Sequence, residues 1–272
     1  MPRLARLDAE LVRRGLARSR EHAGQLIAAG RVSVAGTVAR KPATGVGTDA
    51  AVRVIEAAEP EWASRGARKL LGALAAFTPQ GLTVAGRRCL DAGASTGGFT
   101  DVLLHNGAAH VAAVDVGYGQ LDWRLRTDDR VTVHDRVNVR GLTPDAIGGR
   151  VDLVVADLSF ISLRLVLPAL AGCAAEGADL VPMVKPQFEV GRQRLGSGGV
   201  VRDPADRAEA VLRVVGEACD LGWGLRGVVA SPLPGPSGNV EYFVWLRADA
   251  VETHADADEA ELVRRAVEEG PA

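Results

Sequence analysis

The stretch Leu90-Asp91-Ala92-Gly93-Ala94-Ser95-Thr96-Gly97-Gly98-Phe99-Thr100 predicts the end of a buried strand that turns sharply into a helix. Residues 87–90 provide the strand, and residues 99–106 have the apolar spacing of an amphipathic helix, which Gly107 ends. The three glycines of the turn lack the Cβ atoms that would keep a ligand from the backbone, and the helix start offers unpaired N–H groups. The turn can therefore hold a nucleotide, although its spacing is not the G-x-G-x-x-G of dinucleotide-binding enzymes.

An acidic residue downstream of the turn indicates which nucleotide it could hold. Asp115 lies near the end of a second predicted strand, about 20 residues past the turn, where a carboxylate can bond both hydroxyls of a ribose. This combination favours S-adenosylmethionine over NAD, and the alternative is a tight turn without a ligand. The candidate cofactor-binding residues on the turn are Gly93, Ala94, Ser95, Gly97, Gly98 and Phe99.

Two further side chains are candidates for the same cofactor. Asn138, at the end of the third predicted strand, is the candidate for the adenine edge, and Phe99 is the candidate for packing beside the methionine portion. A capped turn at Asn138 and a core aromatic at Phe99 are the alternative interpretations.

Composition places the chain among soluble globular proteins. Of its 272 residues, 47% are hydrophobic and 24% are charged, and no apolar run reaches the ~18 residues of a membrane span. Residues 1–20 are rich in arginine and lack the apolar segment of a signal peptide, so we expect a cytoplasmic protein that does not bind membranes. The isolated cysteines at 89, 173 and 219 predict small core residues, and we expect neither a metal site nor a disulfide.

Charge is unevenly distributed along the chain. Residues 1–41 contain nine basic and three acidic side chains, whereas residues 249–272 contain eight acids against two arginines. A basic N-terminal segment is typical of proteins that bind a polyanion, and a solvated basic face is the alternative. We treat 249–272 as an acidic tail.

The N-terminal segment has a compact predicted order of helix (7–15), helix (19–29), strand (31–34) and strand (51–55), with a turn at Ala35-Gly36. The sequence RLDAELVRRGLARSREHAGQLIAAGRVSVAG at 6–36 resembles the S4 RNA-binding domain. Ala35 replaces the asparagine usual in that family. The resemblance implies phosphate contacts by arginines of this segment, namely Arg3, Arg6, Arg13, Arg14, Arg18, Arg20 and Arg31.

Beyond residue 86 the chain alternates apolar strands with helices, which predicts an α/β domain with a mostly parallel sheet covered on both faces. Seven strands are expected, near 87–91, 110–115, 131–134, 151–156, 178–184, 225–230 and 240–247. The loop 231–239 is too short for a crossover helix, so we expect the last strand to be antiparallel. This is the architecture of class I (Rossmann-like) methyltransferases. The expected domains are 1–58, a linker at 59–64, 65–248 and the tail.

Lysine is rare in this chain, which has 29 arginines and lysines only at 41, 69 and 185. A position that keeps lysine can require an amine that loses its proton, which arginine cannot do. Lys185 and Asp157 each follow a predicted parallel strand, so both belong to the sheet edge where α/β folds place ligands. Lys69 lies on the preceding helix, and Glu241 enters the last strand.

In order and context, Lys69, Asp157, Lys185 and Glu241 resemble the Lys-Asp-Lys-Glu tetrad of FtsJ-like ribose 2′-O-methyltransferases. With an S4-like segment in front, the chain is similar to the TlyA family, whose members also bear the name hemolysin A. The resemblance implies an S-adenosylmethionine-dependent methyltransferase that acts on ribosomal RNA, on cytidine of 16S or 23S rRNA or of both. For each residue alone, a surface ion pair is the alternative interpretation.

The expected chemistry assigns a role to each member of the tetrad. A lysine ordinarily near pKa 10.4 is a poor base until it is desolvated or crowded by another cation, which Lys69 and the sulfonium would provide for Lys185. Asp157 would orient Lys185 and would also bind the cofactor beside its sulfonium. Glu241 would position Lys69 or the ribose. The alternative functions are an S4-bearing assembly factor without methyl transfer and, from the hemolysin name, a membrane-damaging protein, which no spanning segment supports. The sequence indicates no oligomeric state.

Overall fold

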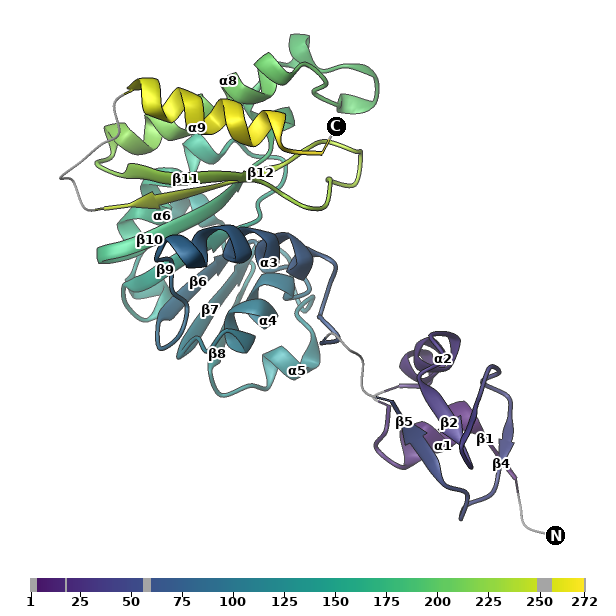
Figure 1. Ribbon diagram of the computed structural model, residues 1–272. Coiled ribbons are helices and arrows are strands. Elements are labelled where there is room, and N and C mark those ends of the chain that lie inside the picture. The colour runs from purple at the N-terminus through teal and green to yellow at the C-terminus, as the bar shows by residue number, and fades with distance from the viewer. Residues whose placement is uncertain (1–3, 18, 56–59, 249–255, 272) are drawn as a thin grey trace. The chain divides into compact units, whose positions relative to one another are not determined.

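The structure is a computed structural model that describes residues 4–17, 19–55, 60–248 and 256–271. Its contacts divide the chain into an N-terminal unit, Met1–Glu61, and a C-terminal unit, Trp62–Ala272 (Figure 1). Arg3, Arg18 and the expected start of the linker at residue 59 lie outside the described residues.

The described residues of the N-terminal unit form two helices and five short strands. The helices are α1 (Leu7–Arg13) and α2 (Arg20–Ala28), and the strands are β1 (Ala5–Arg6), β2 (Val32–Val34), β3 (Thr37–Val38), β4 (Gly45–Val46) and β5 (Val52–Val54). Helix α2 begins where expected because the Ser19 hydroxyl accepts a hydrogen bond from the backbone N–H of His22. Strand β2 pairs with β3 and β5, and apolar side chains of both helices, including Leu11 and Ile27, form the core.

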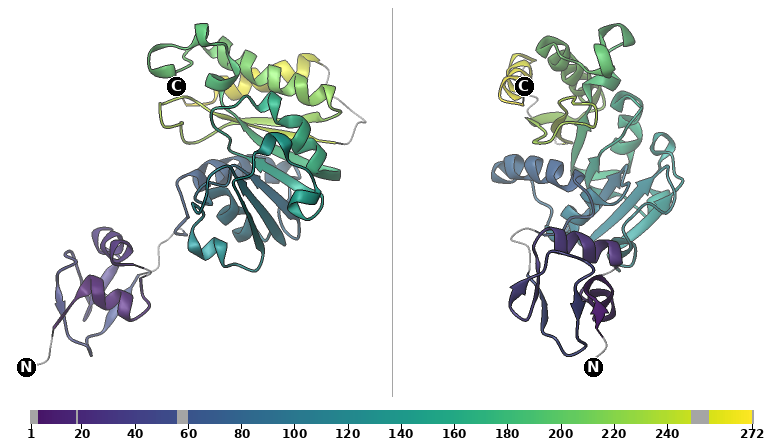
Figure 2. Two further views of the ribbon diagram at one scale, coloured as in Figure 1. Left: turned by 180° about the vertical axis from the view of Figure 1, so that it is seen from behind. Right: turned by 90° about the vertical axis from the view of Figure 1, so that its right-hand side faces the viewer.

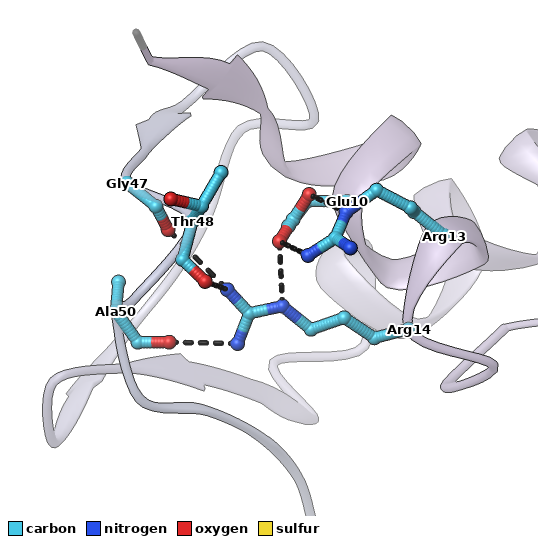
Figure 3. Close-up of polar contacts among 6 residues, drawn as sticks. All are labelled: Glu10, Arg13, Arg14, Gly47, Thr48 and Ala50. Atoms are coloured by element: carbon cyan, nitrogen blue, oxygen red, sulfur yellow. Dashed lines mark hydrogen bonds and ion pairs between the residues drawn. The ribbon is translucent and has the colours of Figure 1, made fainter. Parts of the chain in front are cut away.

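A buried carboxylate organises α1. Glu10 is almost fully buried and binds the guanidinium groups of Arg13 and Arg14 (Figure 3). These arginines hold the pKa of Glu10 at about 2, below its usual range. Arg14 also donates to backbone carbonyl oxygens of Gly47, Thr48 and Ala50, and it thereby ties α1 to the segment before β5.

The C-terminal unit is built on one seven-stranded sheet. Its strand order is β11-β12-β10-β9-β6-β7-β8, and only β12, paired with β10 and β11, is antiparallel, which confirms the expectation (Figure 1). The strands are β6 (Arg88–Ala92), β7 (His110–Asp115), β8 (Val131–Asp135), β9 (Val151–Ala156), β10 (Ala174–Val184), β11 (Gly224–Ala230) and β12 (Tyr242–Arg247).

Helices cover both faces of this sheet (Figures 1 and 2). One core contains side chains of α3 (Gly66–Phe77), α4 (Gly98–His105) and α5 (Trp123–Arg126). The other contains side chains of α6 (Leu167–Cys173), α8 (Pro204–Asp220) and α9 (Asp256–Glu268). The short helix α7 (Pro186–Glu189) follows β10 directly. The sheet is therefore buried on both sides, as its continuous apolar strands require.

Two segments differ from the sequence-based expectation. The alternation of strands and helices predicts a helix near 161–175. Helix α6 instead begins at residue 167, because residues 157–166 form a loop at the sheet edge that ends in a 3₁₀ turn. The stretch treated as an acidic tail contains α9, which buries Val263, Ala266 and Val267 against α8 and β11. The acidic composition of the tail concealed an apolar stripe with helical spacing.

We expect Arg14→Ala to destabilise the N-terminal unit by about 1–3 kcal/mol, because it removes the hydrogen bonds that the Arg14 guanidinium donates to three backbone carbonyl groups and to Glu10. Hydrogen–deuterium exchange of the β2 and β5 amides in the full chain measures this loss. Arg13→Ala is the matched control, since Arg13 also pairs with Glu10 but its side chain is 60% exposed. Equal acceleration of exchange in both variants would contradict the structural role of Arg14.

Candidate active site

The predicted site residues gather at one edge of the sheet. Strands β10, β9, β6 and β7 are consecutive parallel neighbours in the sheet, so the residues after their carboxyl ends lie along the same edge. This edge carries the glycine-rich turn after β6, Asp115 at the end of β7, Asp157 after β9 and Lys185 after β10. The rule that places ligands at strand ends thus brings together residues far apart in sequence.

Two adjoining cavities open at this edge. The Asp115 cavity, of about 490 Å³, is lined by side chains that include Asp115 and Asn138. The lysine cavity, of about 290 Å³, is lined by Lys69, Lys185 and residues of the turn. Both cavities share four lining residues, Gly93, Ser95, Asp157 and Ser159. A cavity of about 610 Å³ between α3, β11 and α9 contains none of the predicted site residues.

The glycines of the turn make room for other parts of the chain, whereas the sequence suggested that they make room for a ligand. Gly93 and Gly97 have positive φ angles of 88° and 98°. A Cβ atom at Gly93 would lie 2.5 Å from the carbonyl oxygen of Asp157, and one at Gly97 would lie 2.3 Å from Leu125. At Gly98 it would meet Ser64. The glycines therefore let other segments of the chain approach the turn, so their presence does not by itself require a ligand.

Asp115 is held rigidly beside the turn. Its two carboxylate oxygens accept hydrogen bonds from the backbone N–H groups of Ser95, at 2.8 Å, and Gly117, at 2.6 Å. Each oxygen has a second lone pair available. The carboxylate therefore lines the cavity in a fixed orientation.

Asn138 and Phe99 have structural roles in addition to their positions at the cavities. The Asn138 side chain accepts a hydrogen bond from the Arg140 backbone N–H at 3.0 Å and caps a 3₁₀ turn, while it lines the Asp115 cavity. Phe99 is 3% exposed and its ring centroid lies 5.9 Å from that of Phe243, while it lines the lysine cavity. The alternative interpretations therefore describe real contacts of both residues.

The four residues of the expected tetrad form two ion pairs. Lys69 Nζ lies 2.5 Å from a carboxylate oxygen of Glu241, and both side chains are buried. Lys185 Nζ lies 2.6 Å from Asp157 Oδ1. The Lys69 pair joins α3 to the residue before β12, and the Lys185 pair joins the ends of β9 and β10. Both lysines and Asp157 line the lysine cavity, so these are not surface pairs.

Ser159 is a further side chain of the candidate site, which the sequence did not indicate. Lys185 Nζ donates a hydrogen bond to the Ser159 hydroxyl at 2.9 Å, and Ser159 lines both cavities. Its position two residues after Asp157, in the same segment after β9, was the available signal. The contact itself depends on the pairing of β9 with β10, which the sequence does not specify.

The loop after β9 is fixed by the segment after β10. Glu189 accepts hydrogen bonds from the Ser162 hydroxyl at 2.6 Å and from the Leu163 backbone N–H at 2.7 Å. Burial raises the pKa of Glu189. The ring of Phe160, which is 92% exposed, lies 5.5 Å from that of Phe188. Asp157 and Ser159 therefore belong to an anchored loop.

A buried acid lies beneath the turn. Asp91 is fully buried in β6 and accepts a hydrogen bond from the Thr100 hydroxyl at 2.7 Å. Among the described residues, its other oxygen has no hydrogen-bond partner. Burial raises the pKa of Asp91 to about 7, and the negative charges of Asp157 and Asp115 act in the same direction.

The arginines expected to contact RNA differ in their availability. Arg6 and Arg20 both bind Asp8, and together they hold its pKa well below the usual range. Arg31 donates to the Ile55 carbonyl oxygen, and Arg14 is occupied by the contacts described above. Arg6, Arg13 and Arg20 keep more than half of their side-chain surface exposed. The exposed arginines of α1 and α2 are therefore better candidates for phosphate contacts than Arg14.

The described part of the chain contains no cluster of His, Cys, Asp and Glu that could hold a metal ion. Within the same residues, every helix is too short or too polar to cross a membrane.

Comparison with known proteins gives the class of the chain. Residues 62–248 match the family model of FtsJ-like methyltransferases, and residues 5–52 match the S4 domain. The fold and these two matches thus define an FtsJ-like methyltransferase domain preceded by an S4 domain.

The chain belongs to the TlyA family, which confirms the resemblance seen in the sequence. It is 63% identical to the Mycobacterium tuberculosis protein named 16S/23S rRNA (cytidine-2′-O)-methyltransferase TlyA, over the full length of both chains. It is 34% identical to Hemolysin A of Brachyspira hyodysenteriae, over 87% of this chain and 97% of that one. A solved structure from Streptococcus thermophilus that bears the name hemolysin has a TM-score of 0.72 at 37% identity, over 99% of this chain and 98% of that one.

The raised pKa of Asp91 predicts a pH-dependent cost. Between pH 4 and pH 7 the unfolded chain loses the Asp91 proton while the folded chain keeps it, so rising pH lowers the free energy of unfolding. We expect Asp91→Asn to stabilise the protein by up to about 4 kcal/mol at pH 8 and by little at pH 4. Urea unfolding monitored by tryptophan fluorescence reports on this unit, because all four tryptophans follow residue 61.

Asp128→Asn provides a control of opposite sign. Hydrogen bonding to Arg130 lowers the pKa of Asp128, so this carboxylate stabilises the fold at neutral pH and its contribution is lost as the pH falls through the lowered pKa. A stability difference between Asp91→Asn and the parent protein that is the same at every pH would contradict the assignment for Asp91.

Proposed function

We propose that the chain transfers a methyl group from S-adenosylmethionine to the 2′-hydroxyl of a ribose in ribosomal RNA, with cytidine of 16S and 23S rRNA as the target. The observation that carries the proposal is the arrangement of the two cavities. The Asp115 cavity suits a nucleoside, and the adjoining lysine cavity contains two lysine–acid pairs. The name of the Mycobacterium tuberculosis relative supports the choice of RNA and nucleoside.

The residues of the Asp115 cavity fit the cofactor. Its volume of about 490 Å³ lies in the range of small-molecule sites. The fixed carboxylate of Asp115 would bond the ribose hydroxyls, Asn138 would face the adenine edge, and the turn from Gly93 to Phe99 would contact the remainder. When bound, the cofactor supplies an electrophilic methyl group on its sulfonium.

The paired lysines would perform the chemistry on the RNA side. Attack by a ribose hydroxyl requires removal of its proton and a fixed direction of approach. Lys185, held by Asp157, would take that proton at Nζ. Lys69, held by the more deeply buried Glu241, would provide a fixed positive charge and contact the ribose. A positioned base of this kind contributes about 10²- to 10⁴-fold to the rate.

The N-terminal unit would supply much of the RNA affinity. Residues 1–41 of this unit contain nine basic and three acidic side chains. The exposed arginines Arg6, Arg13 and Arg20 lie on or beside α1 and α2. Neutralising phosphates with such groups releases counterions, which makes binding depend strongly on salt.

Lys185→Arg tests the role of the base. The variant keeps the positive charge but cannot give up its proton at neutral pH, so we expect methyl transfer to fall by at least ~10²-fold. The measurement is the single-turnover rate on rRNA with S-adenosylmethionine. Calorimetry with the same cofactor should show nearly unchanged affinity, and tight binding of NAD instead would overturn the cofactor assignment.

Lys41→Arg is the matched control for this experiment, because Lys41 lies in the N-terminal unit and is exposed. It should retain the parent rate. If Lys185→Arg also retained most of the parent rate, the tetrad would act by positioning and charge alone.

The double variant Arg13→Gln/Arg20→Gln tests the RNA contacts. We expect weaker rRNA binding and a slope of log affinity against log salt that is smaller by about 1.4–1.8, since each of the two lost phosphate contacts removes about 0.7–0.9. Filter binding over a salt series measures the slope. The control is Arg213→Gln/Arg264→Gln, which removes two exposed arginines from α8 and α9. The same loss of slope in both variants would refute a specific role of the N-terminal unit.

A further inference from the structure

The environment of Lys185 contains a second acceptor beside the tetrad. Lys185 Nζ lies 2.6 Å from Asp157 Oδ1 and donates to Ser159 Oγ at 2.9 Å. Both acceptors belong to the loop after β9, which Glu189 anchors through Ser162 and Leu163. The lysine side chain is only 8% exposed, so few other groups compete for its hydrogens.

Two acceptors determine how the amine is turned. A lysine ammonium has three N–H bonds that rotate freely about the Cε–Nζ bond. Asp157 alone holds one of the three staggered positions. After proton loss, the second N–H bond and the lone pair can then exchange the two remaining positions. With Ser159 as a second acceptor on the same loop, the third N–H bond has one remaining direction. Because Lys185 also lines the lysine cavity, that direction is available to a substrate there.

We propose that Ser159 is a positioning residue, which together with Asp157 directs the third Nζ bond of Lys185, and hence the lone pair left after proton loss, toward the substrate hydroxyl. The inference rests on the proposed function, because it assigns the direction in which Lys185 receives the proton. Ser159 acts through Lys185 and takes part in no covalent step. When its hydroxyl is lost, Asp157 still holds one N–H bond, and the lone pair of the neutral amine can take either of the two remaining staggered positions, of which one is productive.

Ser159 accepts a hydrogen bond from the Lys185 amine and carries no charge of its own. Other charged groups surround the lysine cavity. Asp157 contacts Lys185, and Glu241 pairs with Lys69. Lys69 on α3 and Arg65 just before this helix line the same cavity, and Asp91 lies in β6. A change at Ser159 leaves all of these charges in place, so a change in rate would come from the lost hydrogen bond.

The test compares Ser159→Ala and Ser159→Thr in the full chain. We expect Ser159→Ala to lower the single-turnover rate by about two- to fivefold. Ser159→Thr restores the hydroxyl and should recover the parent rate. Calorimetry with S-adenosylmethionine should give unchanged affinity, which separates this role from a contact with the cofactor.

The double variant Ser159→Ala/Lys185→Arg shows whether Ser159 acts through Lys185. It should be no slower than Lys185→Arg alone. The inference would be overturned if Ser159→Ala lowered the single-turnover rate equally in the parent and in Lys185→Arg, or if Ser159→Ala had the rate of the parent. Either result would leave the proposed function intact. Absence of methyl transfer by the parent protein would instead refute the proposed function, and the role of Ser159 with it.

A spectroscopic measurement tests the contact without relying on activity. Because the chain has lysines only at 41, 69 and 185, ¹⁵N-lysine labelling gives few Nζ signals, which the three Lys→Arg variants assign. We expect the Lys185 Nζ–H signal to be protected from solvent exchange in the parent and in Ser159→Thr, and to broaden in Ser159→Ala. A Lys185 signal that is identical in all three proteins would exclude Ser159 as its positioning partner.

Discussion

The close approach of β6 and β9 at their carboxyl ends determines the geometry of the site. The Asp157 backbone N–H donates to the Ala92 carbonyl oxygen at 3.0 Å, and the Asp157 carbonyl oxygen lies 2.5 Å from the position that a Cβ atom of residue 93 would take. Gly93 makes this approach possible and adopts the positive φ that the turn requires. The same contact places the Asp157 side chain against both cavities and within reach of Lys185. This one backbone contact therefore determines the geometry of both cavities.

The two lysine–acid pairs at this juncture are chemically unequal. Lys69 and Glu241 are both nearly inaccessible to water, whereas a quarter of the Asp157 side chain is exposed beside Lys185. A buried pair of this kind is costly to form and fixes its members in one arrangement. Under the proposed function, the buried pair would supply a fixed charge and the more open pair would take the proton of the substrate hydroxyl.

Much of the fold, and the residues of the site, could be predicted from sequence, because they depend on local patterns and one topological rule. The apolar run at 151–156 predicts β9, and the short loop 231–239 predicts the antiparallel β12. Asp157 and Lys185 could be placed together because each follows a parallel strand. Contacts that depend on strand register or on packing between distant turns, such as those of Ser159 and Arg14, could not be predicted. Helix α9 was not predicted, because the segment was judged by its acidic composition although its apolar residues have helical spacing.

Helix α9 has an electrostatic consequence for how the C-terminal unit meets a polyanion. Its apolar stripe is buried on α8 and β11, so its charged residues face water along the edge of the sheet where β11 lies. Several acids, among them Glu261 and Glu268, are more than half exposed, and the helix contains only two arginines. The net charge of this helix is therefore negative, which disfavours phosphates along this edge. Under the proposed function, RNA would reach the C-terminal unit from its other sides, and α9 would restrict that approach without contacting the RNA.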